Sequence, residues 1–266
     1  MADASNNPII GFGSTTKRTQ DVNASYPNLA FSLAKLMPVS NGSPSKWVSY
    51  MVTGNPSFDT DGTTVLPGNP GRPGTDNTGT LTDNKDGTYV YCFARDVTKI
   101  ADEVAGATFT GANKAADLGD LTYDPSLPHR LTIQIAGDVP GTGSNTPDGV
   151  TVTDRVRLSN PVNVVYDFIP ATGQAIDPAD TAITQRLIVD KASCNECHAK
   201  LGGIPGTDSQ TFHSGSRYDP KYCVVCHTDQ RKYGRTNSAS VGGVFTDPRT
   251  YAVSYTHLTL PTTPYV

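Results

Sequence analysis

Alternating hydrophobic and polar positions recur along much of the chain, between about residues 26 and 170. Successive side chains of a strand point to opposite faces, so an apolar residue at every second position predicts a strand with one buried face. Several such strands, joined by links rich in glycine and proline, favour an antiparallel sandwich or barrel. The predicted apolar stripes are Leu29-Phe31-Leu33, Val48-Tyr50-Val52, Tyr89-Tyr91-Phe93, Leu131-Ile133-Ile135 and Val162-Val164-Tyr166-Phe168.

The links between these strands carry two further signals. Asn84 to Gly87 reads as a turn leading into the Tyr89 strand, because glycine adopts a positive φ without steric cost. Gly54 to Thr82 is rich in glycine, proline, asparagine and aspartate, and we expect a long mobile loop there. Its aspartates lack the spacing of an EF-hand, so we interpret them as solvated acids rather than calcium ligands.

The periodicity changes at Asp177. Asp177 can cap a helix, a proline follows it, and Ile183, Leu187 and Ile188 then recur at helical spacing. A short helical turn carrying the sequence CNECHAKL is expected next, ending at the glycine pair 202–203. We therefore predict a β domain over residues 1–175, a second, partly helical module over 176–236 and a tail over 237–266.

Two copies of the pattern Cys-x-x-Cys-His lie in the second region. The first is Cys194, Cys197 and His198, and the second is Cys223, Cys226 and His227. This spacing is the attachment signature of c-type haem. Two thiols three positions apart can bond to the vinyl groups of one porphyrin, and the histidine that follows is held beneath the iron as its proximal ligand. The pattern predicts two covalently bound haem c groups, one on each motif.

Two alternatives use the same cysteines. A zinc ion could be held by the four sulfurs of two Cys-x-x-Cys pairs. The segment between the pairs, residues 198–222, is longer than the usual loop of a zinc ribbon, and zinc gives no reason for a histidine after each pair. A pair of disulfides is the other alternative, and it also leaves both histidines unexplained.

Composition narrows the class of protein. The chain of 266 residues has a net charge of −4 and no basic stripe, which argues against a nucleic-acid partner. No stretch is long and apolar enough to span a membrane. The N-terminus has no apolar signal-peptide core, although covalent haem attachment takes place outside the cytoplasm. We therefore expect an exported protein whose signal is not part of this chain.

The motifs and their surroundings resemble one family. The run from Val165 to Phe168, the segments CNECHAKL and YCVVCH, and the stretch His213-Ser-Gly-Ser-Arg217 are similar to the outer-membrane decahaem c-type cytochromes of metal-reducing bacteria (the OmcA/MtrC type). The segment DPSLPHRLTIQIAG, residues 124–137, resembles the β domain of that family. The resemblance covers roughly residues 89–235.

The resemblance implies a fold and a setting. The fold is a mainly β N-terminal domain, an antiparallel split barrel or sandwich with Greek-key-like connections, followed by a small, loop-rich, partly helical multihaem module. The setting is the extracellular side of the outer membrane, with other multihaem cytochromes and a porin conduit as partners, and metal oxides, flavins or soluble metals as acceptors. Family members carry ten haems, so two motifs indicate an N-terminal fragment. The last fifteen or so residues, including His257, read as a sequencing artefact outside the fold.

Four further residues are candidates for specific roles. We expect His213 to be the distal ligand of the first haem, because the glycine-rich segment after His198 lets the chain turn back over the porphyrin. His129 is a second candidate distal ligand. The alternative is that His129 is a structural residue at a strand end, hydrogen-bonded to backbone. Arg217 is a candidate partner of a haem propionate, since its planar fork suits carboxylates. Cys92, alone in a strand, is expected to be a buried core residue.

These expectations favour electron transfer by bis-histidine haem over substrate turnover, because two axial imidazoles leave no open iron position. A multihaem reductase of the nitrite or sulfite type is the enzyme alternative, and it needs one haem without a distal ligand. A zinc-stapled β binding module is the non-redox alternative.

Overall fold

The computed structural model describes residues 1–40, 45–66, 68, 70–109, 114–177, 180, 191–198, 212–227, 239–241 and 244–246. The fold is mainly β, as predicted. Its elements in chain order are β1 (Leu29–Met37), β2 (Lys46–Ser49), β3 (Ser57–Phe58), β4 (Val65–Leu66), β5 (Thr80–Asp83), β6 (Tyr89–Cys92), α1 (Ile100–Ala105), η1 (Ala115–Leu118), β7 (His129–Ile135), β8 (Val162–Ile169), β9 (Gln174–Ala175), α3 (Lys191–His198), η2 (Phe212–Gly215), α4 (Pro220–Cys226), β10 (Ala239–Val241) and β11 (Val244–Thr246).

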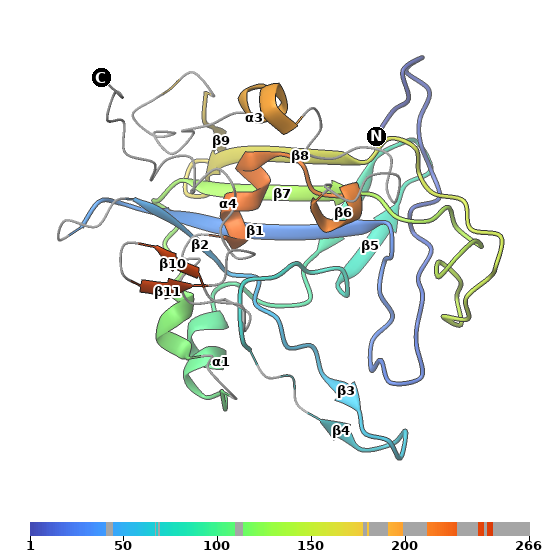
Figure 1. Cartoon of the computed structure of the whole chain (residues 1–266), viewed down its shortest axis with the longest axis horizontal. Helices are drawn as coiled ribbons and strands as arrows, with labels where there is room; N and C mark the ends of the chain where they lie inside the picture. Colours follow the sequence, from blue (N-terminus) through green and yellow to red (C-terminus); the bar gives the residue numbers. More distant parts are fainter. Residues whose placement is uncertain are drawn as a thin grey trace.

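The centre of the fold is a five-stranded antiparallel sheet in the order β2-β1-β7-β8-β9 (Figure 1). The long strands β1, β7 and β8 pair in register, so that Lys35, His129 and Phe168 lie side by side across the sheet. Three two-stranded ribbons, β3-β4, β5-β6 and β10-β11, accompany it. The described strands form no closed barrel, so of the two predicted forms the open layered arrangement is the one observed.

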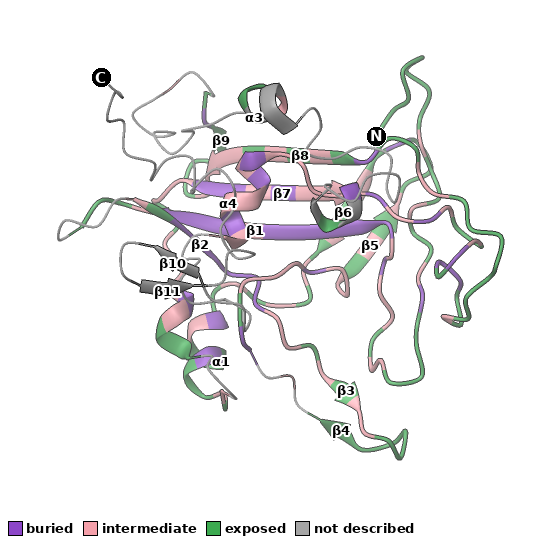
Figure 2. Ribbon diagram, viewed as in Figure 1, coloured by how far each residue is buried: buried purple, intermediate pink, exposed green. Residues whose placement is uncertain are grey.

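The sheet has a near face, which carries α4, and a far face on the opposite side. Apolar side chains cover the far face along β1 and β2. Phe31 of β1 stacks on Tyr91 of the β5-β6 ribbon, with ring centroids 3.8 Å apart. A second cluster joins the end of β2 to α1 and η1, and its members are Val48, Tyr50, Met51, Val52, Ile100, Val104, Leu118 and Leu121. Figure 2 shows that burial is concentrated on β1 and β2. These two strands therefore anchor the core.

The near face of the sheet carries α4, which lies across β1, β7 and β8 (Figure 1). Trp47 of β2 and Val225 of α4, both buried, share one apolar cluster with Ala34 and Leu36 of β1. The helix that holds the second Cys-x-x-Cys-His motif is therefore packed on the β sheet. The domain boundary near Ala175 stays a prediction.

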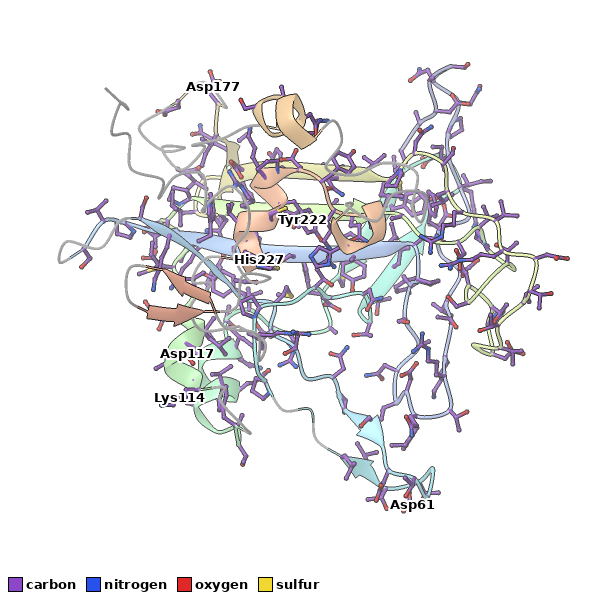
Figure 3. The ribbon with its side chains drawn as sticks, in the orientation of Figure 1. Asp61, Lys114, Asp117, Asp177, Tyr222 and His227 are labelled. Carbon is purple, nitrogen blue, oxygen red and sulfur yellow. The ribbon has the colours of Figure 1, made fainter. Side chains whose placement is uncertain are left out.

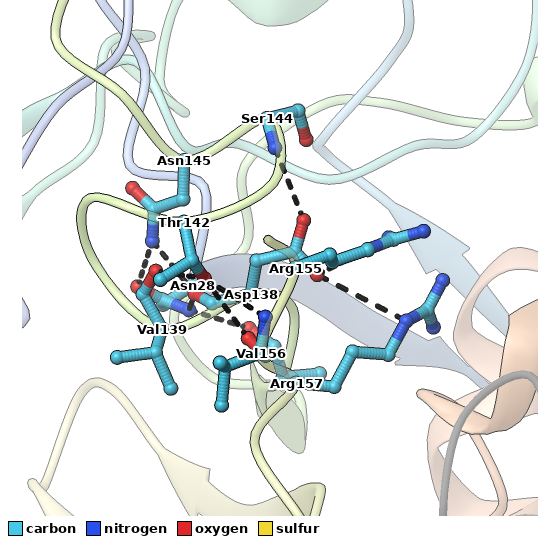
Figure 4. A network of polar contacts seen from close by, with 10 residues as sticks. Asn28, Asp138, Val139, Thr142, Ser144, Asn145, Arg155, Val156 and Arg157 are labelled. Carbon is cyan, nitrogen blue, oxygen red and sulfur yellow. Dashed lines mark hydrogen bonds and ion pairs between the residues drawn. The ribbon is translucent and has the colours of Figure 1, made fainter. Parts of the chain in front are cut away.

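The loop between β7 and β8 is held by a polar network around Asp138 (Figure 4). The buried Asp138 carboxylate accepts from Arg155 Nε at 2.6 Å and lies 3.9 Å from Arg157 Nε. The backbone carbonyl of Asp138 accepts from the side-chain amides of Asn28 and Asn145, at 2.8 and 2.7 Å. This network ties the loop to the start of β1.

Two expectations from the sequence need correction. Cys92 is exposed, because its face of the β5-β6 ribbon is covered by no other layer of the described chain. The segment from Gly54 to Thr82 is not a single loop, because it contains β3, β4 and the start of β5. Near its end Asp76 pairs with Phe31 of β1, and the buried Asp76 carboxylate accepts from the backbone N–H of Ala94 at 2.6 Å. The turn at Asn84 to Gly87 is confirmed, with Gly87 at φ +87°.

The helix predicted after Asp177 lies mostly outside the described residues, as does the tail from residue 247. Among the described residues, no helix combines the length and the apolar character needed to cross a bilayer.

Candidate functional site

The second motif occupies the last turn of α4. Asp219 caps the helix by accepting the backbone N–H of Lys221 at 2.8 Å, and Pro220 suits the first helical position. Residues three apart on a helix share a face, so Cys223 and Cys226 lie on one side of α4. His227 follows as the C-terminal cap. The sequence thus presents two thiols and an imidazole together at one helix end.

His213 lies close to His227. Their ring centroids are 6.2 Å apart, with an angle of 55° between the ring planes. His213 belongs to the short helix η2 and has φ +47°, a left-handed conformation that is uncommon for residues other than glycine. Such strain is often found at ligand sites, where surrounding structure holds it in place. Figure 3 labels His227 at the lower end of α4, with Tyr222 one turn above it.

Burial and positive charge shape the electrostatics of this cluster. Desolvation by the surrounding protein lowers the pKa of His213 to about 4, although the residue is exposed to solvent in part, and the charges of Arg217, His227 and Arg72 lower it further. Burial also lowers the pKa of His227, with Arg217 and Arg72 acting in the same direction. Both imidazoles are therefore neutral at pH 7, which is the form that ligates metals.

The pKa of the Cys226 thiol is shifted in the opposite direction to the pKa values of the two histidines. Burial raises its pKa, while Arg217 and Arg72 lower it by smaller amounts. Neither Cys223 nor Cys226 is in a disulfide.

Arg217 lies between this cluster and the sheet. Its Nε donates to the side-chain oxygen of Gln134 on β7 at 2.7 Å, and its guanidinium lies over the Tyr222 ring, 5.4 Å from the centroid. Burial raises the pKa of Tyr222 to about 12, so this phenol is neutral under all ordinary conditions. Arg217 is held in position, and its charge acts on both histidines.

The sheet fixes the segment that joins His213 to α4. Asn163 of β8 donates from its side-chain amide to the carbonyl of Ser216 at 2.8 Å. Its side-chain oxygen accepts from the backbone N–H groups of Tyr218 and Asp219, at 2.8 and 3.2 Å. We did not single out Asn163 from the sequence. The sequence does contain a signal for it, because Asn163 and Asp167 are polar positions that alternate with the apolar stripe on β8.

The first motif forms α3, in agreement with the predicted helical turn. The side chains of Cys194, Cys197 and His198 lie outside the described residues, as does the predicted end of the turn at residue 202. In the described part of the chain, no three His, Cys, Asp or Glu side chains converge as a metal site. The zinc alternative depends on Cys194 and Cys197, so it is not tested.

His129 lies away from the His213 and His227 cluster, on the far face of β7. It is fully buried. Its Nδ1 donates to the carbonyl of Leu127 at 2.8 Å, and its Nε2 lies 3.2 Å from the hydroxyl of Tyr50, whose ring stacks on it. Both ring nitrogens therefore have protein partners.

Comparison with known proteins finds one matching family, over residues 186–251. Residues 186–251 match the family described as outer membrane cytochrome MtrC/MtrF-like, domains II/IV. This match spans both predicted haem motifs and agrees with the resemblance seen in the sequence over residues 186–235. No curated protein matched in the sequence comparison.

Two solved structures are similar to the chain. MtrC from Shewanella baltica OS185 has 22% identity and a TM-score of 0.46, over 85% of this chain and 26% of that one. The outer membrane decaheme cytochrome OmcA has 17% identity and a TM-score of 0.47, over 92% of this chain and 28% of that one. The chain thus spans about a quarter of the length of each.

Proposed function

Because residues 186–251 match the MtrC/MtrF-like outer-membrane cytochromes, we propose that this chain is part of a multihaem c-type cytochrome that carries electrons through covalently bound haem. The first haem is held by Cys194, Cys197 and His198, on the strength of their spacing. The second is held by Cys223, Cys226 and His227, whose positions at the end of α4 support it. When bound, haem supplies an iron that changes between the ferric and ferrous states.

His213 is the distal ligand of the second haem, opposite His227. A bond from a metal to an imidazole nitrogen is about 2 Å long, so two imidazoles on opposite sides of one metal ion have ring centres roughly 6 Å apart. The observed separation of 6.2 Å fits this arrangement. This single observation carries the proposal. The expectation that His213 serves the first haem is the alternative, and it stays a prediction because the side chains of the first motif lie outside the described residues.

Two axial histidines favour electron transfer over substrate chemistry. If His213 and His227 both bound the iron of the second haem, they would leave it no open position for a small molecule. His129 is a structural histidine in this proposal, because its ring nitrogens are engaged by Leu127 and Tyr50. The distal ligand of the first haem then lies elsewhere in the protein. The enzyme alternative, a reductase with an open iron, has no support at the second motif.

The setting follows from the family. The electrons would pass at the cell surface, on the extracellular side of the outer membrane, to metal oxides, flavins or soluble metals. Other multihaem cytochromes and an outer-membrane porin would be the partners. The match to the outer membrane cytochrome family supports this setting.

Intact mass tests covalent attachment. The chain is expressed in a host with cytochrome c maturation machinery, and its mass should exceed that of the polypeptide by two haems. The double substitution Cys223→Ala and Cys226→Ala should remove one haem, and Cys194→Ala with Cys197→Ala should remove the other. A wild-type mass equal to that of the bare polypeptide would refute the proposal.

A second experiment decides which haem His213 serves. In the chain with Cys194→Ala and Cys197→Ala, only the second motif can carry haem. Adding His213→Ala should convert that haem from low-spin to high-spin in electron paramagnetic resonance, whereas adding His129→Gln should not. An unchanged low-spin signal with His213→Ala returns His213 to the first haem or to no haem.

A further inference from the structure

The loop between β4 and β5 reaches the second motif, a contact that the sequence pattern does not predict. Its segment from Arg72 to Gly74 is bonded to the chain just beyond β2. The N–H of Thr53 donates to the carbonyl of Arg72 at 2.8 Å, and the N–H of Gly74 donates to the carbonyl of Met51 at 2.8 Å. The N–H of Arg72 donates to the hydroxyl of Thr53 at 3.2 Å. The backbone of Arg72 is therefore fixed to the β domain.

This segment contacts a cysteine of the second motif. The carbonyl oxygen of Gly74 lies 3.6 Å from the sulfur of Cys226, within reach of a weak S–H hydrogen bond. The same carbonyl accepts from the hydroxyl of Ser32 on β1 at 3.4 Å. The thiol that would bond to the porphyrin thus lies directly against the β domain. Any flat cofactor attached to Cys226 would have residues 72–74 among its neighbours.

This segment also carries a positive charge. Arg72 stands two residues before Gly74, whose carbonyl contacts the Cys226 sulfur, and Arg217 lies over the ring of Tyr222, on the same helix as Cys226. One arginine of the β domain and one of the loop before α4 therefore lie beside the second motif. Haem carries a pair of propionate carboxylates, and guanidinium groups suit carboxylates in charge and geometry.

We propose that Arg72 is a second carboxylate-binding cation of the second haem site, so that the β domain supplies one wall of that site. The proposal rests on the proposed function, since it requires haem on Cys223 and Cys226. Arg72 is a positioning and charge-setting residue for the haem rather than an iron ligand. Its side chain is exposed, which leaves the guanidinium accessible to a cofactor bound beside residues 72–74.

The expected consequence is electrostatic. A positive charge close to a haem disfavours the ferric form, which carries one more positive charge than the ferrous form. Removal of the Arg72 charge should therefore lower the reduction potential of the second haem. At a fixed electrode potential near the midpoint, the ratio of oxidised to reduced second haem should rise by a factor on the order of two to five.

Spectroelectrochemical titration of the full chain carrying both haems tests this. Arg72→Gln should lower one of two midpoint potentials, Arg72→Glu should lower it further, and Arg72→Lys should restore it. Arg18→Gln, which removes the same charge from an exposed loop of the β domain, should leave both potentials unchanged. Added salt should reduce the effect, because Arg72 is exposed.

Each outcome has one meaning. Unchanged potentials in both Arg72→Gln and Arg72→Glu, with both haems present by mass, would overturn the role of Arg72. So would an equal shift in Arg18→Gln. If the wild-type chain carries no haem on the second motif, the proposed function itself fails. Circular dichroism of each variant verifies folding, and Arg72→Lys provides the comparison should a variant of altered charge fold poorly.

Discussion

Arg130 of β7, which is buried, and Asp167 of β8, which is partly buried, form a bidentate ion pair. Arg130 Nε donates to Oδ1 of Asp167 at 2.7 Å, and Nη2 donates to Oδ2 at 2.7 Å. The remaining nitrogen, Nη1, donates to the backbone carbonyl of Lys221 in α4 at 3.1 Å. The guanidinium also lies over the indole of Trp47, 4.2 Å from its centroid. One side chain thus joins two strands of the sheet to the helix of the second motif.

We expect Arg130→Gln to destabilise the chain by about 3–5 kcal/mol, because it leaves the Asp167 carboxylate without its charge partner in a partly buried position. Urea denaturation followed by far-ultraviolet circular dichroism measures this loss. Lys99→Gln is the matched control: its partner Asp96 is 3.7 Å away and both side chains are exposed, so no measurable change is expected. Equal effects of the two substitutions would contradict a special role for Arg130.

Val225 provides a separate test of how α4 docks on the sheet. Its side chain is fully buried against Trp47 and the β1 residues Ala34 and Leu36. Val225→Ala removes two methyl groups' worth of packing and leaves a cavity, at a cost of about 2 kcal/mol. Val156→Ala, in an exposed loop, should have no measurable effect. Should the two variants unfold at the same urea concentration, Val225 would not be part of the core.

The strands could be predicted from the sequence because alternation is a local signal. Leu131, Ile133 and Ile135 fall on β7 as expected, and the stripe from Val162 to Phe168 falls on β8. The alternation does not predict which of the two faces of a strand is more buried by the rest of the chain. On β8 the apolar positions Val162, Val164 and Tyr166 are the exposed ones, whereas Asn163 and Asp167 face α4. Asn163 and Asp167 contact the α4 side through polar groups, and a hydrophobic pattern does not detect such contacts.

The candidate site was predictable in part for a similar reason. The spacing of Cys223, Cys226 and His227 identifies a motif within five consecutive residues. The approach of His213 to His227 and of Gly74 to Cys226 depends on chain segments that meet only in the fold. For His129 the sequence left two interpretations open, and the hydrogen bonds to Leu127 and Tyr50 favour the structural one.

His129 should make the stability of the β domain depend on pH. Burial lowers its pKa below the ordinary value of 6.5; Lys35 lowers it further, and the bond to Leu127 and the charge of Asp124 oppose the shift. The folded chain therefore keeps His129 neutral while the unfolded chain binds a proton below about pH 6.5. The stability due to this histidine is fully present above pH 6.5 and is lost as the pH falls towards the lowered pKa.

Denaturant unfolding of the haem-loaded chain at several pH values between 5 and 7 checks this expectation. In wild type the free energy of unfolding should fall as the pH is lowered, and His129→Gln should flatten the slope. The slope is the readout, because the substitution also removes packing against Tyr50 and lowers stability at every pH. Identical slopes would mean that His129 does not titrate in this range. Any iron-bound imidazole that unfolding releases would add the same slope to wild type and to His129→Gln, so the difference between the two slopes reports on His129.

Asn163 should control the geometry of the proposed axial pair without touching it. Its amide makes three hydrogen bonds to residues 216–219, the segment that joins His213 to α4. Asn163→Ala removes all three and should destabilise this segment by roughly 2 kcal/mol. Because His213 has a left-handed backbone that its surroundings must hold, loosening the segment should let it leave the iron in part of the population.

In electron paramagnetic resonance, Asn163→Ala should therefore reduce the low-spin fraction of the second haem, while the intact mass still shows both haems attached. Asn163→Asp is the matched variant, since it keeps an oxygen acceptor for Tyr218 and Asp219 but loses the donor to Ser216, so its effect should be intermediate. Asn84→Ala, at an exposed turn where the amide bonds only to Thr88, should leave the spin state unchanged. A low-spin fraction in Asn163→Ala equal to that of wild type would show that the contacts of β8 do not position His213, even if His213 is the ligand.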